Sequence, residues 1–288
     1  MKSLNICAAA LFLLSSILVS AADRSPAPVF HFIKFPGSVH TTLYGVSNTG
    51  FGVGIYYDSN SVQHGYMVSP SGKFTTIDNP GGTTYLEGIN SSGTATGYYI
   101  DSSSNYFAFV YSKGVFTNIT PPGGSQTLAF GINDNGLVTG EYIDPNTGLD
   151  EGFTFDGTNY VTILSPQSGS PALGYDTNVH GISTVQWGDS NGDTESSLFN
   201  GTSYQTVNVP GAVNSYIHDI NSAGDVVYSW TDSSGNYHGA ARISGKITTF
   251  DAPGCSGGTF ADGINDHHII VGACHQAGSN SVGFYVQY

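Results

Sequence analysis

The stretch GINDNGLVTGEY, residues 131–142, is one copy of a pattern that recurs along the chain. Related copies begin every 43 to 45 residues. Their first residues are Gly45, Gly88, Gly131, Gly174, Asp219 and Gly263. A single copy, with its glycines and acids, would fit a ligand loop or a calcium loop as well as a turn. Recurrence at a nearly fixed period indicates instead that the stretch belongs to a structural repeat.

Each copy lies in a unit of four short segments separated by turn residues. A segment closed by proline, such as FTTIDNPGG at residues 74–82, precedes the GIN segment, and two further segments follow it. Segments of about five apolar or alternating residues have the length of strands. Six four-stranded units of this period predict an all-β, six-bladed β-propeller over residues 30–288. A β-solenoid, which also stacks repeats, is the alternative. Which of the four strands lies innermost is left open.

The composition agrees with many short strands and tight turns. The chain has 39 glycines among 288 residues, 12% of its residues are aromatic, and only 10% are charged. Aromatic residues favour strands, and glycine, serine and asparagine favour the turns between them.

The opening stretch is interpreted as a hairpin. Asn135-Gly136 is a favoured pair for a turn in which both central residues have positive φ. Gly140, inside the return strand, is expected to permit close packing between blades. A nucleotide loop is excluded, because no helix follows the glycines. The fourth unit matches the motif least well. There the alignment places Asp176 at the position of the asparagine, Val179 at that of the turn glycine and Ser183 at that of the strand glycine.

The pattern GIN-x-x-G-x-x-x-G, followed by an HGF-like or HAF-like segment, resembles the HAF-type extracellular repeats of bacteria. The residues that carry the resemblance are Gly88-Ile89-Asn90, Gly131-Ile132-Asn133, Gly263-Ile264-Asn265, His64-Gly65-Tyr66, Phe107-Ala108-Phe109 and His238-Gly239. The resemblance implies an exported repeat protein with a propeller-like fold. It supplies no catalytic residues.

The N-terminus has the pattern of a secretory signal peptide. Lys2 precedes an apolar run, and small side chains follow it at residues 19–21. We expect cleavage after Ala21, a short linker at 22–29, and a protein that is secreted, either periplasmic or extracellular. The apolar run is short for a membrane span, so no membrane insertion is expected after cleavage.

The charge of the chain excludes some partners. Cleavage would remove one of the seven basic residues and none of the 21 acidic residues, which takes the formal charge from −14 to −15. Because phosphate binding requires cationic side chains, nucleic acid is not expected as a partner.

Two cysteines, Cys255 and Cys274, would remain after cleavage. Export favours a disulfide between them, and pairing of their two segments would bring both to one end of a hairpin. The alternative is a zinc site with nearby histidines, but the spacing matches no standard zinc finger. These histidines are His267, His268 and His275.

The loop GDSNGDTES of the fourth unit suggests calcium, the one cofactor that the sequence indicates. Asp189, Asn191, Asp193 and Glu195 stand at alternate positions, as oxygen ligands do in D-x-N-x-D loops. The alternative is an Asx turn, because other units carry an aspartate at the same place. The loop of the third unit is a weaker version of the same pattern.

The residue before each GI pair varies, whereas the scaffold around it repeats. The six residues are assigned as Tyr44, Glu87, Phe130, Leu173, His218 and Asp262. Glu87, His218 and Asp262 are candidate catalytic acids or bases for attack on a glycan. The alternative is that they are polar residues facing solvent at the strand ends.

These observations favour a monomeric, non-catalytic binding or scaffolding module for extracellular protein or carbohydrate. The alternative is a hydrolase or lyase that acts on polysaccharide in the central funnel. Convergence of Glu87, His218 and Asp262 in one pocket would favour the enzyme.

Overall fold

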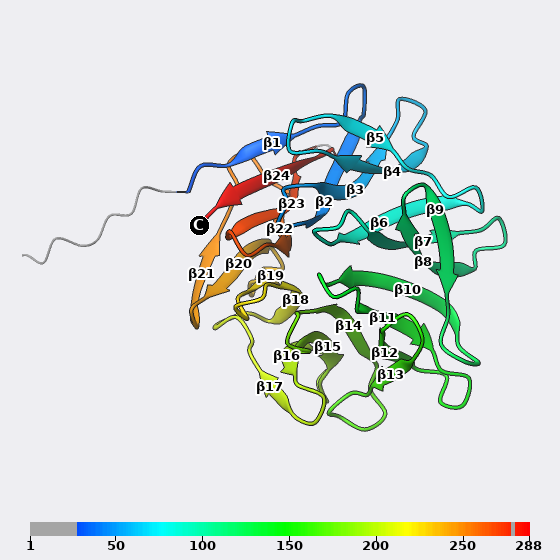
Figure 1. Ribbon diagram of the computed structural model, residues 1–288. Helices are drawn as coiled ribbons and strands as arrows, with labels where there is room; N and C mark the ends of the chain where they lie inside the picture. The colour runs from blue at the N-terminus through cyan, green and yellow to red at the C-terminus, as the bar shows by residue number, and fades with distance from the viewer. Residues whose placement is uncertain (1–27, 278–279) are drawn as a thin grey trace, which may run out of the picture.

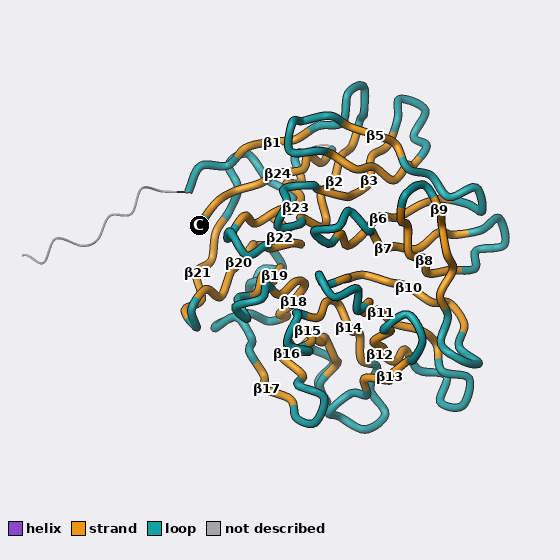
Figure 2. Tube along the Cα trace, in the orientation of Figure 1, coloured by secondary structure: helices purple, strands orange, loops and turns teal. Residues whose placement is uncertain are grey.

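The computed structural model describes residues 28–277 and 280–288, and all regular elements in these residues are strands. The strands form six four-stranded antiparallel sheets arranged around one axis (Figures 1 and 2). The predicted six-bladed β-propeller is therefore confirmed. The predicted signal peptide lies outside the described residues.

The six sheets are numbered here as blades, and the strands of each are given from the axis outward. Blade 1 contains β2 (His40–Val46), β3 (Gly52–Tyr57), β4 (Gln63–Val68) and β5 (Phe74–Thr76). Blade 2 contains β6 (Thr83–Ile89), β7 (Ala95–Ile100), β8 (Tyr106–Ser112) and β9 (Val115–Ile119). Blade 3 contains β10 (Ser125–Ile132), β11 (Val138–Ile143), β12 (Asp150–Phe155) and β13 (Tyr160–Ile163).

The remaining blades follow the same order. Blade 4 contains β14 (Ala172–Thr177), β15 (Ser183–Gly188), β16 (Thr194–Phe199) and β17 (Tyr204–Thr206). Blade 5 contains β18 (Asn214–Ile220), β19 (Val226–Thr231), β20 (Tyr237–Ile243) and β21 (Lys246–Phe250). Blade 6 contains β22 (Gly258–Ile264), β23 (Ile269–His275), β24 (Ser281–Gln287) and β1 (His31–Ile33).

The two ends of the described chain share blade 6. Strand β1 is antiparallel to β24, with Phe32 opposite Phe284, and Figure 1 shows the two side by side. The GIN strand is the innermost strand of every blade, which settles the point that the sequence left open. Each sequence unit is therefore offset by one strand, because its first segment completes the preceding blade.

The hydrophobic core lies between neighbouring blades. One cluster joins Val53 of blade 1 to Leu86, Ala95 and Phe109 of blade 2, all of them inaccessible to solvent. Each blade thus buries apolar side chains only by packing against its neighbours, as expected for stacked repeats.

The first glycine of the GIN motif allows neighbouring inner strands to approach closely. A Cβ atom on Gly88 would lie 2.6 Å from the carbonyl oxygen of Phe130 in the next blade. Gly45 and Gly263 meet the next blade's carbonyl at the same distance. Any side chain here would collide with backbone, so the motif requires glycine at these positions.

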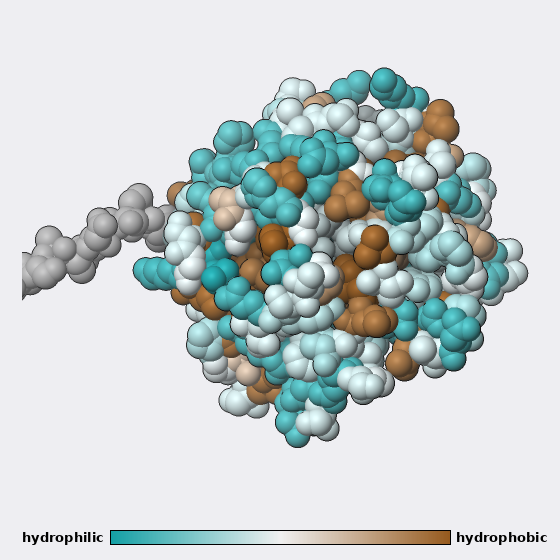
Figure 3. Space-filling view, turned by 60° about the horizontal axis from the view of Figure 1, so that its bottom comes forward, coloured by the Kyte–Doolittle hydropathy of each residue, from teal (hydrophilic) through white to brown (hydrophobic). Residues whose placement is uncertain are grey.

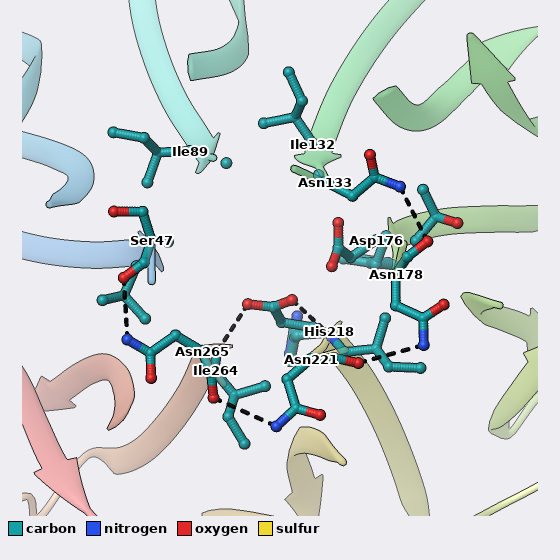
Figure 4. A pocket seen from close by; sticks show the side chains of 18 of the residues that line it. Ser47, Ile89, Ile132, Asn133, Asp176, Asn178, His218, Asn221, Ile264 and Asn265 are labelled. Carbon is teal, nitrogen blue, oxygen red and sulfur yellow. Dashed lines mark hydrogen bonds between the residues drawn. The ribbon is translucent and has the colours of Figure 1, made fainter. Parts of the chain in front are cut away.

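The asparagine of the motif links blades 2 to 6 each to the next blade, while blade 1 has Ser47 at this position. The Asn133 side-chain amide donates to the carbonyl of Asn178 at 3.0 Å, while its Oδ1 accepts the amides of Asn135 and Leu137 in its own hairpin. Figure 4 shows several of these links. We call the set the asparagine belt. Its members are Asn90, Asn133, Asn178, Asn221 and Asn265, which donate in turn to Asn133, Asn178, Asn221, Asn265 and Ser47.

The hairpin in the opening stretch is confirmed, but its predicted geometry is wrong. Gly136 has φ of 84°, whereas Asn135 is not among the residues with positive φ. The Gly136 amide donates to Asn133 O and the Asn133 amide to Leu137 O, so the loop is longer than a two-residue turn. Gly140 also acts differently from the expectation. Its Cβ would meet Leu128 O of the same blade at 2.0 Å, beside the bulge between Ala129 and Gly131.

The predicted alignment of the fourth unit is also wrong. Asn178 occupies the asparagine position, and Gly181, with φ of 75°, is the turn glycine. Asp176 replaces the first glycine of the motif. Val185 replaces the strand glycine and lies opposite Gly174, whereas in blade 2 Gly97 lies opposite Leu86. The glycine of this pair therefore lies on the inner strand in blade 4 and on the second strand in blade 2. For this reason an alignment of the glycines misplaces the motif in blade 4.

The predicted disulfide between Cys255 and Cys274 is present and ties the loop before β22 to the end of β23. Cys274 is fully buried in the core cluster of blades 5 and 6.

The belt makes a prediction about stability. Asn133→Ala removes one link between blades and two bonds inside a hairpin, so we expect a loss of about 2–3 kcal/mol in the free energy of unfolding. Asn135→Ala, in the same turn but exposed, should cost less than about 1 kcal/mol. Urea denaturation of both variants checks this, and equal costs would contradict a special role for the belt.

Candidate functional site

The ends of the six inner strands surround a cavity of about 300 Å³ on the propeller axis. It lies toward the face that carries the hairpins between first and second strands, which we call the turn face. Figure 4 shows side chains from several blades around it. The opposite end of the axis is called the loop face.

Six residues, one from each blade, form the ring at the base of this cavity. In blade order they are Tyr44, Glu87, Phe130, Tyr175, His218 and Asp262. The three predicted acid–base residues, Glu87, His218 and Asp262, therefore converge in one cavity. The assignment of Leu173 was wrong, because the motif of blade 4 begins at Asp176, two residues later than the alignment assumed, and the residue before it is Tyr175.

One half of the ring is aromatic. The rings of Phe130 and Tyr175 stack with centroids 4.8 Å apart, and His218 meets Tyr175 edge-on at 5.2 Å. Tyr98 of β7 continues the series, with its ring 6.5 Å from that of Phe130. These contacts fix the aromatic faces in place before any ligand arrives.

The other half of the ring is acidic. Glu87 and Asp262 stand on either side of Tyr44, since their blades flank blade 1. Burial, and then the charge of Asp262, raise the pKa of Glu87 to about 8. Burial likewise raises the pKa of Asp262 to about 8. Both carboxyls therefore hold a proton at neutral pH and can donate as well as accept hydrogen bonds.

His218 is held neutral in the same ring, because burial lowers its pKa to about 4. Its Nε2 atom and Oδ2 of Asp262 are inaccessible to solvent and have no hydrogen-bond partner. A buried polar atom without a partner costs roughly 1–3 kcal/mol, so such atoms point to a functional role.

Two further acids line the cavity where blades 4 and 5 replace the first glycine of the motif. Asp176 and Asp219 are hydrogen-bonded to each other, and burial followed by the charge of Asp219 raises the pKa of Asp176. Oδ2 of Asp219 accepts the Ile264 amide of blade 6 at 2.7 Å. These carboxyls therefore bridge blades where direct backbone contact is lost.

A polar network crosses the mouth of the cavity. The Asn48 side-chain amide donates to Oδ2 of Asp266 at 2.8 Å and to Oδ2 of Asp134 at 3.2 Å. The backbone amide and hydroxyl of Ser91 donate to the Asp134 carboxylate. Those of Ser222 donate to the Asp266 carboxylate. Sequence reasoning missed this network, because its members come from different units.

Glu141 of β11 is another acid that sequence reasoning missed. It is largely buried, its Oε2 has no hydrogen-bond partner, and burial followed by the charge of Asp150 raises its pKa to about 8. Burial, and then the charge of Glu141, raise the pKa of Tyr175 in the ring. The sequence signal that could have found Glu141 is a carboxylate in the strand segment VTGEYI, where the equivalent segments of blades 1 and 2 have Ile55 and Tyr98.

The predicted calcium loop is closed by its own hydrogen bonds. Oδ1 of Asp189 accepts the amides of Asn191 and Asp193 at 2.7 and 3.0 Å, which is an Asx turn. Glu195 turns away and bonds to Asn208. Asp144 closes the third unit's loop in the same way. Within the part of the chain that the structure describes, no three His, Cys, Asp or Glu residues are grouped to hold a metal ion.

The fold and site were compared with known proteins. No family model matches the chain, and no curated protein matches it. Among solved structures, the SapL1 lectin in complex with alpha-methyl fucoside has a TM-score of 0.56 at 11% identity, covering 87% of this chain and 94% of its own. AofleA from Arthrobotrys oligospora has a TM-score of 0.54 at 10% identity, covering 91% and 86%. The fucose-specific lectin from Aleuria aurantia has a TM-score of 0.54 at 10% identity, covering 89% and 98%. At these identities the likeness shows the propeller fold.

The raised pKa values predict how stability depends on pH. Glu87 and Asp262 keep their protons up to about pH 8 when folded, whereas unfolded carboxyls lose them near pH 4. The folded state then binds more protons, so its stability falls as pH rises and levels off above about 8. The lowered pKa of His218 has the opposite effect, because it makes stability rise with pH below about 6.5. The test therefore runs from pH 6.5 to 8.

Glu87→Gln replaces the protonated acid by an amide of the same shape. We expect urea denaturation to show a flatter decline from pH 6.5 to 8 in this variant, with each group contributing less than about 1.4 kcal/mol per pH unit. Asp156→Asn, at an exposed turn between β12 and β13, is the control and should keep the wild-type slope, because hydrogen bonds in its turn lower the pKa of Asp156 and it titrates below this range. A Glu87→Gln profile parallel to wild type would contradict the assignment.

Proposed function

We propose that this chain is an exported, monomeric, non-catalytic carbohydrate-binding module of the HAF-type repeat kind, which binds one sugar unit of a glycan in the axial cavity. The observation that carries the proposal is the ring itself. The aromatic rings of Phe130 and Tyr175 lie on one side, and the carboxyls of Glu87 and Asp262, which can form hydrogen bonds, lie on the other. A sugar presents C–H groups on one face and hydroxyls around its edge, and this arrangement suits both.

The size and charge of the cavity limit the class of ligand that it can bind. A volume of about 300 Å³ is at the small end for ligand pockets and suits one sugar ring. Among the described residues that line it there is no lysine or arginine. Phosphorylated, sulfated and uronic-acid glycans would lack a counter-charge there, so the proposal concerns neutral or basic sugars.

Two further observations support the proposal. Solved propellers with TM-scores above 0.5 include lectins, among them the SapL1 lectin with a bound fucoside. The N-terminal pattern at residues 1–21 and the disulfide between Cys255 and Cys274 agree with export to an oxidising compartment. Across the described residues, nothing helical is long and apolar enough to cross a membrane.

A second candidate is a glycan-cleaving enzyme. It is favoured by the convergence of Glu87, His218 and Asp262 and by the unpartnered atoms of the last two. Protonated carboxyls beside a sugar would be able to act as general acids.

The test is a glycan-array screen of the full chain, followed by titration of the best ligand and a reducing-end assay. We expect binding without product. Tyr175→Ala should weaken binding at least about tenfold, because it removes the central stacking face. Release of reducing ends that is lost in Glu87→Gln would favour the enzyme instead.

Tyr237→Ala is the matched control. Tyr237 begins β20 at the loop face, where its ring packs against Phe260 at 4.8 Å, away from the cavity. We expect its affinity to stay within about twofold of wild type. If this variant loses binding and Tyr175→Ala keeps it, the ligand site is on the loop face and the proposal for the cavity is wrong.

A further inference from the structure

We propose that the axial cavity selects a ligand with an organic ammonium group, namely an amino sugar whose amine is free, and that Glu87 and Asp262 are its counter-ions. This inference rests on the proposed glycan-binding function and names the substrate class. It assigns the ammonium to the acidic half of the ring and the sugar ring to the aromatic half.

The arrangement of the ring carries the inference. Glu87 and Asp262 flank Tyr44, while Phe130 and Tyr175 occupy the opposite half. A group in the centre therefore has carboxyl side chains on one side and aromatic rings on the other. Ammonium groups bind to this combination, because carboxylates neutralise the charge and aromatic faces attract it.

The acids of the cavity have no cationic partner within the protein. None of the described lining residues is lysine or arginine, and His218 is held neutral. Oδ2 of Asp262 bonds to nothing in the described chain, and solvent does not reach it. A ligand ammonium in the cavity would supply the missing positive charge, and it would bond to Oδ2 once the Asp262 side chain turns toward it.

Proton release should accompany binding. The pKa of each carboxyl is near 8 without ligand, and a cation nearby favours the ionised form. A ligand with permanent charge should therefore bind more tightly as pH rises from 6 to 9. Other titratable groups facing these carboxyls are Tyr44, Tyr85, Tyr98, Tyr175, Asp176, His218 and Asp219.

The experiment is calorimetric titration of the full chain with three probes at constant ionic strength. They are a glucosamine tetramer with free amines, the N-acetylated tetramer, and tetramethylammonium chloride. Measurements at pH 6, 7.5 and 9 are made for the wild type, Glu87→Gln and Asp262→Asn, with Asp150→Asn, an exposed acid-to-amide change that does not line the cavity, as the control. Thermal melting shows that each variant is folded, as expected for amides that replace protonated acids.

At pH 7.5 we expect the free-amine tetramer to bind at least about tenfold more tightly than the acetylated one, and each pocket variant to lose that preference while Asp150→Asn keeps it. Tetramethylammonium should bind weakly in the wild type, with an affinity that rises toward pH 9. Equal binding of both tetramers, unchanged by the pocket variants, would overturn the inference and leave glycan binding intact. If tetramethylammonium alone binds, the amino-sugar assignment fails and the inference with it, and the glycan array again decides the wider function. If no probe binds, the inference fails, and the glycan array decides the wider function separately.

Discussion

The fold depends on how closely six inner strands can approach around one axis. At Gly45, Gly88 and Gly263 the next blade's carbonyl lies where a side chain would begin, so glycine sets the spacing of the ring. The asparagine two residues later uses both ends of its amide, one for its own hairpin and one for the next blade. An aspartate at this position could not donate a hydrogen bond to the next blade, and a leucine could neither donate nor accept one. This requirement explains why asparagine recurs in the motif.

The departures from this constraint gather where chemistry is available. Blades 4 and 5 replace the first glycine with Asp176 and Asp219, and these carboxyls bridge the blades instead. The residue before that position faces the cavity and makes no packing contact that repeats from blade to blade, so its identity varies, with tyrosine in blades 1 and 4 and four other residue types in the remaining blades. Repetition thus builds the wall of the site, and variation within the repeat determines what the wall presents.

Much of the fold could be predicted from the sequence, because period, strand length and turn residues are local properties. The number of blades and the four strands in each followed from spacing, and the disulfide from export and the pairing of two segments. Spacing also made Glu87, His218 and Asp262 equivalent positions, but their convergence depends on which strand is innermost, which the sequence left open.

Other parts of the site could not be predicted. Tyr175 was missed because Gly174 and Val185 exchange sizes across a strand pair, which is visible only in the register. Asn48, Asp134 and Asp266 meet across the axis, and no local pattern joins residues 218 positions apart. The raised pKa of Asp176 beside Asp219 depends on burial, which the sequence does not give. Figure 3 shows apolar side chains as separate patches among hydrophilic ones on one face of the surface.

The central claim is that the axial cavity is the ligand site. A crystal structure of the full chain soaked with the free-amine glucosamine tetramer tests it most directly. The account predicts one sugar ring in the cavity between Tyr44 and Tyr175, with its amine beside Glu87 and Asp262. Sugar bound at the blade edges or on the loop face, with the cavity free of it, would contradict the account.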